Sequence, residues 1–379
     1  MGRRGHGEGS IARRKDGRYQ AAITLENHER KYFYGKTRKE VQDKLNKALY
    51  EQKQGMLATG PQQTLKVFLE KWLEQVCRLT KRANTYKTYR SAIRAHILPS
   101  LGYVKLQKLS VERLQAFFAE KQEHTKPATL AKIRDALKSA LDDAVKQGLV
   151  ARNVAAFVSL PHIERYEGLV LTEEQARKLL DVARCSHLDG LLLVALTTGM
   201  RQGELLALRW SDIDFDTGVL QVRHNVTYVN GVGFVEGEPK TKAGRRKVVL
   251  PTVVIEGLKA HRERQAEQRL KAAEKWHEQG LVFPTAQRNS KVPGGFLRAN
   301  SVVASFKMLL KRADLPNVRF HDLRHSVATI LFAAGVDLKV ISDLLGHSSI
   351  AVTSDIYARL LPDMQRGVVK KMDDLFGSS

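Results

Sequence analysis

Two histidines, an arginine and a tyrosine stand near the C-terminal end of the sequence with types and spacing that could do chemistry. His321 and Arg324 are three residues apart, and His347 and Tyr357 follow them. On a helix, that spacing places His321 and Arg324 on one face, about one turn apart. Two imidazoles and a guanidinium suit a phosphate-like anion, and the phenol supplies a hydroxyl that can attack it.

Two further cations upstream could complete such a site. Arg201 follows the helix-breaking run Thr-Gly-Met, and Lys240 stands in a basic turn. Transfer of a phosphoryl group without a metal requires fixed positive charge on the non-bridging oxygens, a nucleophile in line and an acid for the leaving oxygen. Arg201 and Arg324 can bind phosphate through forked, charged hydrogen bonds. Lys240 can protonate a leaving 5′ oxygen, and Lys242 is an alternative acid.

The tyrosine makes a separate energy source unnecessary. A covalent link between Tyr357 and phosphorus would conserve the energy of a phosphodiester, so we expect no ATP or other cofactor. His321 and His347 can donate to a phosphate oxygen and exchange protons near neutral pH. His321 and His325 have the spacing of a metal-binding pair, but no glutamate follows His321 and no third ligand is suitably placed, so no metal site is expected.

Short helices must position these groups. Apolar residues between 320 and 334 recur at the helical period, and Gly335 ends the run. A second short helix is predicted over 337–345 and ends at Gly346, which leaves His347 at a helix terminus. A third segment with its own apolar stripe carries Tyr357.

The region before these helices is predicted to mix helices and strands. Thr172 and Gln175 form a capping box, and Asn230-Gly231 marks a hairpin. Glu204 is expected to be the structural partner of a nearby cation rather than a catalytic base. The predicted helices are 173–183, 191–197, 204–210, 253–278 and 301–313, and the predicted strands are 219–229 and 247–250.

The charge of the chain points to a polyanionic partner. The 379 residues carry a formal net charge of +23, and 43% of them are hydrophobic, as in ordinary globular proteins. Residues 1–60 hold 14 basic and 7 acidic residues, and residues 61–160 hold 18 and 8. The first 160 residues are therefore expected to bind nucleic acid, and the C-terminal part is expected to carry the catalytic residues.

Residues 65–158 are predicted to be all helical, with four helices whose regularly spaced aromatic residues form the core. One buried stripe is predicted to include Val67 and Trp72. Basic residues between the apolar positions are candidates for phosphate contacts, although such residues are often only solvated. They are Lys81, Arg82, Lys87, Arg90 and Arg94.

Residues 1–56 are predicted to form three short strands and a helix, with a hairpin turn at Asp16-Gly17 and a capping box at Thr37 and Glu40. A sheet covered by one helix has one open face, which could enter a groove of DNA or be an ordinary solvated basic surface. The residues expected on that face are Arg13, Arg14, Lys15, Arg18, Lys31 and Tyr32.

The remaining composition excludes several classes of protein. Cys77 and Cys185 give neither a metal-binding spacing nor a disulfide framework, which fits a reducing cytoplasm. No apolar run approaches the roughly 18 residues of a membrane span, and the first residues lack the apolar core of a signal peptide.

Five motifs together resemble the tyrosine recombinase (phage integrase) family. They are Thr198–Trp210, Pro239–Lys242, His321–Arg324, Leu344–Ser348 and Thr353–Tyr357, and they occur in the family's order. The likeness covers the catalytic half of the chain. Residues 65–158 resemble the family's helical core-site-binding domain, and residues 1–56 resemble the arm-site-binding domain of integrases from temperate phages and conjugative transposons. One departure is Arg359, where many relatives have histidine.

The resemblance implies a fold class and a set of roles. The chain would be multidomain and mainly α with small sheets: an arm-site DNA-binding domain (1–56), a core-site DNA-binding domain (65–158) and a mixed α+β catalytic domain with a C-terminal tail (171–379). Tyr357 would be the nucleophile that leaves a 3′-phosphotyrosyl link and a free 5′-hydroxyl. The phosphate-activating residues would be Arg201, Lys240, His321, Arg324 and His347.

The same resemblance implies partners. They are double-stranded DNA with core-type and arm-type attachment sites, three further copies of the chain in a homotetramer, an excisionase and a host DNA-bending protein, in the cytoplasm of a bacterial host. Two other functions stay open: a non-catalytic DNA-binding protein of the same fold, and an enzyme that nicks and reseals DNA like a type IB topoisomerase. The complete set of functional groups argues against the first, and the separate N-terminal basic module argues against the second.

Overall fold

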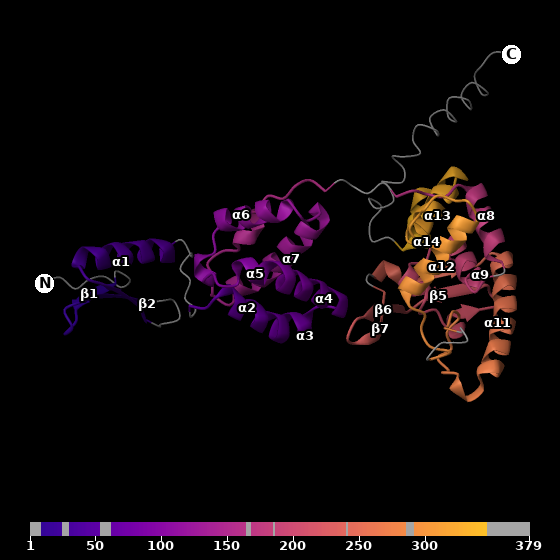
Figure 1. Cartoon of the computed structure of the whole chain (residues 1–379), viewed down its shortest axis with the longest axis horizontal. Coiled ribbons are helices and arrows are strands. Elements are labelled where there is room, and N and C mark those ends of the chain that lie inside the picture. Colours follow the sequence, from indigo (N-terminus) through magenta and orange to yellow (C-terminus); the bar gives the residue numbers. More distant parts are fainter. Residues whose placement is uncertain are drawn as a thin grey trace, which may run out of the picture. The chain divides into compact units, whose positions relative to one another are not determined.

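A computed structural model describes residues 9–24, 30–53, 62–163, 168–184, 186–239, 242–285 and 292–346. The chain divides into two compact units, residues 1–165 and 166–379 (Figure 1). Helices predominate in both, and the strands form small sheets. The expected fold class, mainly helical with small sheets, is confirmed.

The first part of unit 1 is a three-stranded antiparallel sheet covered by one helix. Strands β1 (Ser10–Arg13), β2 (Tyr19–Thr24) and β3 (Arg30–Gly35) lie in that order, and α1 (Arg38–Lys53) packs on them. The core contains Ala21, Ile23, Val41 and Leu45. The Asp16-Gly17 turn is confirmed, since Gly17 has φ +80°. At the start of α1 the Thr37 hydroxyl accepts from the Glu40 N–H (3.2 Å), while the Glu40 carboxylate accepts from the Lys36 N–H rather than from Thr37.

The strand register corrects the prediction that six DNA-binding candidates share the open face of this sheet. Arg13 is paired with Tyr19, and Lys31 with Ile23, so both lie on the side of the sheet that α1 covers. Tyr32 is on the opposite, open side, and it is 44% exposed.

Arg14 also reaches the open side, because its guanidinium lies over the ring of Tyr34 (5.3 Å). Lys15 is in the hairpin turn and Arg18 directly follows it. The predicted single basic face is therefore divided between the sheet's two sides and its β1–β2 turn.

The second part of unit 1 is the predicted set of four helices. Two of them contain π-helical turns. The first runs through α2 (Leu65–Trp72), η1 (Leu73–Cys77) and α3 (Arg78–Thr80), and the second through α4 (Ala83–Ala92), η2 (Ile93–Ile97) and α5 (Leu98–Leu101). After η3 (Leu106–Lys108), the others are α6 (Val111–Gln122) and α7 (Pro127–Lys146), with η4 (Val154–Phe157) at the end.

The aromatic residues of these helices are core residues, as predicted. Trp72, Phe117 and Phe118 are buried, and the Trp72 indole donates to the Asp143 carboxylate (2.8 Å). Val67 was expected on the buried face and is 53% exposed, because Leu65, Phe68 and Leu69 fill that face instead. The five basic candidates of this module are all exposed: Lys81, Arg82, Lys87, Arg90 and Arg94.

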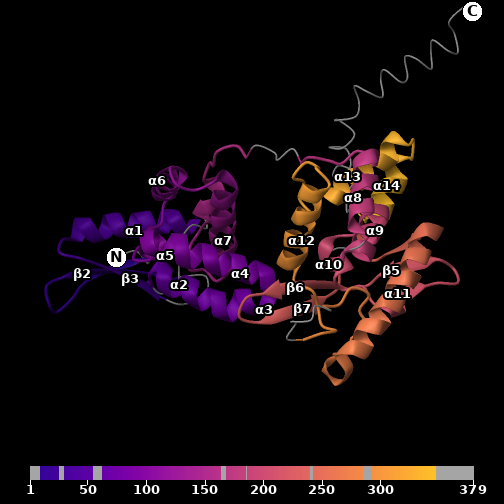
Figure 2. The same cartoon turned by 45° about the vertical axis from the view of Figure 1, so that its right-hand side comes forward.

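Unit 2 is built around a buried apolar helix. Helix α9 (Asp189–Thr198) is apolar on all sides and packs against α8 (Glu173–Ala183), α11 (Thr252–Ala272) and α13 (Asp322–Ala333). Short elements α10 (Gln202–Leu205), η5 (Trp210–Asp212), η6 (Lys242–Gly244) and η7 (Ala273–Lys275) connect longer ones, and α12 (Ala299–Arg312) and α14 (Leu338–Leu345) complete the helices (Figure 2).

The strands of unit 2 form two small sheets. One contains β4 (Ile213–Asp214), β5 (Val219–Val222) and β8 (Arg246–Val249), and the other is the hairpin of β6 (Asn225–Val229) and β7 (Gly233–Gly237). The predicted strand 219–229 is wrong as a single element. Val222 pairs with Arg246 in one sheet and Asn225 pairs with Gly237 in the other, so the chain changes partners between them.

Two predicted helices are too long. The helix expected over 204–210 ends at Leu205, because the backbone beyond it binds another segment: the Val282 N–H donates to Leu208 O (2.8 Å) and the Trp210 N–H to Gly280 O (2.9 Å). The helix expected to reach residue 278 ends at Ala272. Among the helices that the structure describes, none has the length and apolar character that crossing a membrane requires.

Candidate active site

Arg201 is delivered to the surface by a sharp break after α9. Gly199 ends that helix in the left-handed conformation (φ +59°), and the Thr198 hydroxyl donates to Val194 O (2.6 Å). Arg201 then directly precedes α10, where its N–H donates to the carboxylate of Glu204 (3.0 Å). The predicted Thr-Gly-Met break is confirmed, and it fixes the backbone of Arg201 from both sides.

His321 and Arg324 are positioned by the first turn of α13. His321 directly precedes the helix instead of lying inside it as predicted, while Arg324 is within its first turn. The buried Asp322 carboxylate accepts from the Arg319 N–H (3.1 Å) and from its guanidinium (2.9 Å), which fixes the entry to the helix. The Ser326 hydroxyl donates to Asp322 O (2.9 Å) and accepts from the Leu171 N–H (2.9 Å).

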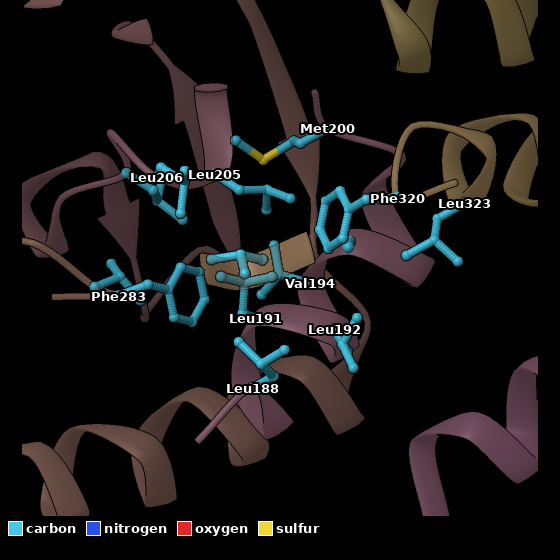
Figure 3. Packing of buried hydrophobic residues seen from close by; sticks show 14 of the residues in the cluster. Leu188, Leu191, Leu192, Val194, Met200, Leu205, Leu206, Phe283, Phe320 and Leu323 are labelled. Atoms are coloured by element: carbon cyan, nitrogen blue, oxygen red, sulfur yellow. The ribbon is translucent and has the colours of Figure 1, made fainter. Parts of the chain in front are cut away.

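Packing holds the two arginine-bearing segments in one core. Met200, next to Arg201, and Phe320 and Leu323, which flank the His321–Arg324 turn, belong to the same buried cluster (Figure 3). A direct hydrogen bond joins the segments as well: Nη1 of Arg324 donates to Gly199 O (2.8 Å). Residues more than 100 positions apart in sequence are thus placed side by side by apolar packing and one charged hydrogen bond.

The Arg324 guanidinium has unused binding capacity. The residue is 3% exposed, and among the described residues its Nη2 has no hydrogen-bond partner. Burial, followed by the charges of Arg201 and Arg246, lowers the pKa of Arg324 to about 9. The group is still protonated at neutral pH, so it presents a buried positive charge and a free donor to the site.

Arg201 and Arg246 share the buried carboxylate of Glu204. Nη1 of Arg201 donates to Oε1 of Glu204 (2.9 Å) and Nη2 donates to Gly346 O (3.2 Å). Arg246 donates to Oε2 of Glu204 (3.2 Å). Burial raises the pKa of Glu204, but Arg246 and Arg201 outweigh burial and hold the pKa below its ordinary value. The expectation that Glu204 is a structural partner of a cation is confirmed.

His321 lies in surroundings that oppose its protonation. The ring reaches solvent, yet the surrounding protein removes part of its hydration, and His325, Arg324 and Arg201 add positive charge nearby, so the pKa of His321 is lowered to about 4. Its ring packs edge-on against the ring of His325, with 5.6 Å between the ring centroids. The imidazole is neutral at pH 7 in the free protein, and an anion bound beside it would raise its pKa again.

Arg201 and Arg324 both lie close enough to His321 to lower its pKa, and Arg201 also lowers the pKa of Arg324, so the three residues meet at one place. Lys240, His347 and Tyr357 lie outside the described residues, as does the segment 351–356 that was expected to carry the tyrosine. Helix α14 ends at Gly346 (φ +66°) as predicted. Across the described parts of the chain, no cluster of three or more His, Cys, Asp or Glu side chains could hold a metal ion.

Comparisons with known proteins identify the family to which the chain is similar. Residues 169–364 match the phage integrase family, and residues 64–122 match the N-terminal SAM-like domain of phage integrases. A tyrosine recombinase XerC-like protein of Caldanaerobacter subterraneus subsp. tengcongensis is 33% identical over 382 residues, which cover 94% of this chain and 96% of the relative.

The chain belongs to the phage integrase family of tyrosine recombinases. This tyrosine recombinase is an enzyme, a site-specific DNA recombinase. Its fold is also found in solved integrases. The Tn1549 transposon integrase in complex with transposon right end DNA has a TM-score of 0.67 at 22% identity, covering 82% of this chain and 99% of that chain. A lambda integrase tetramer bound to a Holliday junction has a TM-score of 0.57 at 20% identity, covering 94% and 96%.

One member of the recombinase site was missed by sequence reasoning. From the sequence, Lys240 and Lys242 are singled out in this part of the chain and Arg246 is not, but the Arg246 side chain is 6% exposed and bound to Glu204. The alternation of β8 could have revealed it. Val248 and Leu250 are buried and Lys247 and Val249 are exposed, so the period of two places Arg246 on the buried side.

Gly199→Ala is expected to destabilise the recombinase by roughly 2–4 kcal/mol. A Cβ at this position would lie 2.2 Å from Cδ2 of Leu345, and φ is positive. Gly231→Ala is the matched control, because Gly231 has φ +84° but nothing within 4 Å of its Cβ position, so only the backbone strain of about 1–2 kcal/mol applies. Urea unfolding followed by tryptophan fluorescence measures both variants, and equal losses would contradict the proposed contact with Leu345.

Proposed function

We propose that this recombinase cuts and rejoins duplex DNA through a 3′-phosphotyrosyl link formed by Tyr357. The Tyr357 hydroxyl attacks the scissile phosphate and loses its proton to solvent, the bond between phosphorus and the 5′ oxygen breaks, and Lys240 gives that oxygen a proton, with Lys242 as the alternative acid. The 5′-hydroxyl of a partner strand then attacks the phosphotyrosine and restores Tyr357. Bond energy is conserved at each exchange, so neither ATP nor a metal takes part.

The Nη2 of Arg324, which has no hydrogen-bond partner among the described residues, is the observation that best supports this proposal. A buried guanidinium normally has partners for its donors, and one without a partner is destabilising unless a ligand supplies it. Arg201 is 34% exposed at its side chain, so its remaining donor capacity can reach a ligand at the surface. A tetrahedral phosphate with two non-bridging oxygens can accept from both guanidiniums, as the transition state of strand exchange requires.

The electrostatics of the site support an anionic substrate. Three guanidiniums, those of Arg201, Arg246 and Arg324, are opposed by the buried carboxylate of Glu204. A phosphodiester would supply the missing negative charge and raise the lowered pKa values of Arg324 and His321. His321 and His347 would then bind the phosphate oxygens and exchange protons with them.

The partners proposed for this chain are DNA and further copies of the chain. The related Tn1549 integrase is bound to transposon right end DNA, and the related lambda integrase is a tetramer on a Holliday junction. The net charge of +23 and the exposed cations of α4 and η2 fit such a DNA partner. We place the recombinase on DNA in the cytoplasm of a bacterial host, as the integrase of a mobile element, with an excisionase and a host DNA-bending protein as accessory partners.

A nicked duplex that carries a candidate attachment site tests the catalytic part of the proposal. Beside a nick, the short released strand diffuses away, so the covalent intermediate accumulates. The full chain should yield a protein–DNA adduct on a denaturing gel, and peptide mapping should find the DNA on Tyr357. An adduct on another residue, or none with any attachment site that the chain binds, would overturn the proposal.

Deleting residues 1–56 should abolish recombination between complete attachment sites and leave cleavage of a short core site within about threefold of the full chain. The reason is that the sheet and α1 are proposed to bind separate arm-type sites, while the helices of 65–158 grip the core site. The measurements are recombination on plasmids with complete sites and adduct formation on a nicked core duplex. Equal recombination by the truncated and full chains would exclude the arm-binding role.

A further inference from the structure

Arg246 contacts three separate segments of the active site with one guanidinium. Its Nε donates to Leu344 O (2.6 Å), its Nη1 and Nη2 each donate to Oε2 of Glu204 (3.2 Å), and its Nη1 also lies 3.3 Å from Gly244 O. These four hydrogen bonds occupy most of the donors that an arginine has. Arg246 is therefore turned toward the protein and away from any substrate.

Each of the three segments carries, precedes or follows a residue proposed to act on the phosphate. Leu344 belongs to the last turn of α14, and the chain continues through Gly346 to His347. Gly244 ends η6, the turn that follows Lys240. Glu204 holds the guanidinium of Arg201.

The end of α14 is seated directly against Arg246. A Cβ added to Gly346 would lie 3.0 Å from Cδ and 3.1 Å from Nη1 of Arg246, and 2.5 Å from Ala243 O. The Gly346 carbonyl in turn accepts from Arg201 (3.2 Å). Gly346, the C-cap of α14, thus lies between Arg201 and Arg246, the two arginines that share Glu204.

We propose that Arg246 is a positioning residue for DNA cleavage, which holds the lysine turn and the end of α14 in register with Arg201. The inference rests on the function proposed above, since it assigns Arg246 to the placement of Lys240 and His347 around the same phosphate. Arg246 does not touch the reacting atoms. It acts through the carbonyls of Gly244 and Leu344 and through the carboxylate of Glu204.

A stabilising role alone explains Arg246 poorly. A buried ion pair gains little over well-packed apolar residues, because taking both charges out of water offsets their attraction. A single flat guanidinium that reaches three backbone and side-chain acceptors fixes geometry, which an apolar side chain of equal size cannot do. A misplacement of about 1 Å at a reacting centre can lower a rate about 10²-fold.

Single-turnover cleavage of the nicked attachment-site duplex, with the full chain in saturating excess, tests this inference. Arg246→Met should lower the cleavage rate at saturation about 10²-fold or more, while the apparent Kd for DNA stays within about threefold. Arg246→Lys should recover about tenfold over the Met variant, because an ammonium can still bind Glu204 and one carbonyl. Arg245→Met is the matched control, since Arg245 is 57% exposed at its side chain and pairs with Glu238. Its rate should stay within about twofold of the unchanged chain.

The folded fraction of each variant, from thermal unfolding, separates positioning from loss of fold. If Arg246→Met is poorly folded, the Lys variant decides, and its reduced rate with unchanged Kd and full folding supports the inference. Rates for Arg246→Met that equal those of Arg245→Met, or that fall only with its folded fraction, overturn it. Such a result leaves the proposed function standing, because the unchanged chain still forms the adduct. No adduct from the unchanged chain would instead remove the proposed function and this inference with it.

Discussion

The Tyr357→Phe variant is expected to form no covalent adduct with a nicked attachment-site duplex that captures the unchanged chain. Phenylalanine keeps the aromatic ring and removes only the oxygen that would bond to phosphorus. Loss of the nucleophile of a covalent mechanism lowers the rate by at least about 10⁴-fold, which is below detection on a denaturing gel. The apparent Kd for the duplex should change less than about threefold, because binding depends on the cations around the phosphate and on the basic helices.

A second tyrosine provides the control for this experiment. Tyr103 is 73% exposed, so Tyr103→Phe should form the adduct at the rate of the unchanged chain. An adduct of undiminished yield from Tyr357→Phe would show that another residue attacks the phosphate. Loss of the adduct together with loss of DNA binding would show a damaged site instead, and the Kd measurement distinguishes the two results.

Local sequence rules correctly located the turns that deliver the site residues. Gly199, Gly335 and Gly346 all have positive φ, and each follows a helix where its sequence position predicts an end. The capping box of Thr172 and Gln175 is also present. These signals depend on a few neighbouring residues, and for that reason the sequence alone was sufficient to place Arg201 just after a helix end and to end α14 at Gly346.

The errors arise where distant segments decide the local structure. The helix after Arg201 ends at Leu205 because residues 280–282 bind the backbone beyond it. The chain near residue 223 leaves one sheet for another because its partners differ. Residues 280–282, and strand β8 as the partner of β5, both lie far along the chain, so periodicity over a short window could not reveal either event.

The N-terminal sheet shows a different kind of error. Side chains alternate between the two faces of a strand, and the length of each hairpin decides which residues share a face. Arg13 and Lys31 are expected on the open face of the sheet because they are basic. The register instead pairs them with Tyr19 and Ile23, on the side that α1 covers. Charge alone therefore identified a basic domain without identifying its faces. Arg246 shows the converse, since its charge gives no sign that the side chain is buried against Glu204.

The Arg324→Met variant is expected to cleave the nicked duplex roughly 10³-fold more slowly than the unchanged chain at saturating protein. In the free protein, Nη1 of Arg324 is used by Gly199 O, and Nη2 has no partner within the described residues. The second donor and the charge are thus available to the phosphate when charge builds up on its oxygens. Methionine fills a similar volume and supplies neither, so transition-state stabilisation is lost while the fold is retained.

Stability should respond to this substitution differently from activity. Burial and the charges of Arg201 and Arg246 already lower the pKa of Arg324 to about 9, which means that its surroundings in the protein disfavour its charge. Removing the guanidinium relieves that repulsion, but it leaves Gly199 O without its donor, a loss of about 1–3 kcal/mol. The two effects oppose each other, so the thermal unfolding midpoint should move by less than about 5 °C.

Lys339→Met separates loss of a phosphate-binding group from loss of one positive charge. Lys339 lies on α14, is 65% exposed at its side chain and pairs with Asp343 (2.9 Å), so its removal should change the cleavage rate by less than about twofold. If Arg324→Met were slowed no more than Lys339→Met, the buried donor would have no role in cleavage. If Arg324→Met were slow and also melted far below the unchanged chain, Arg324 would be needed for folding rather than for binding phosphate. A slow, stable Arg324→Met variant is the result expected if Nη2 binds the phosphate, because the guanidinium would then matter more to the reaction than to the fold.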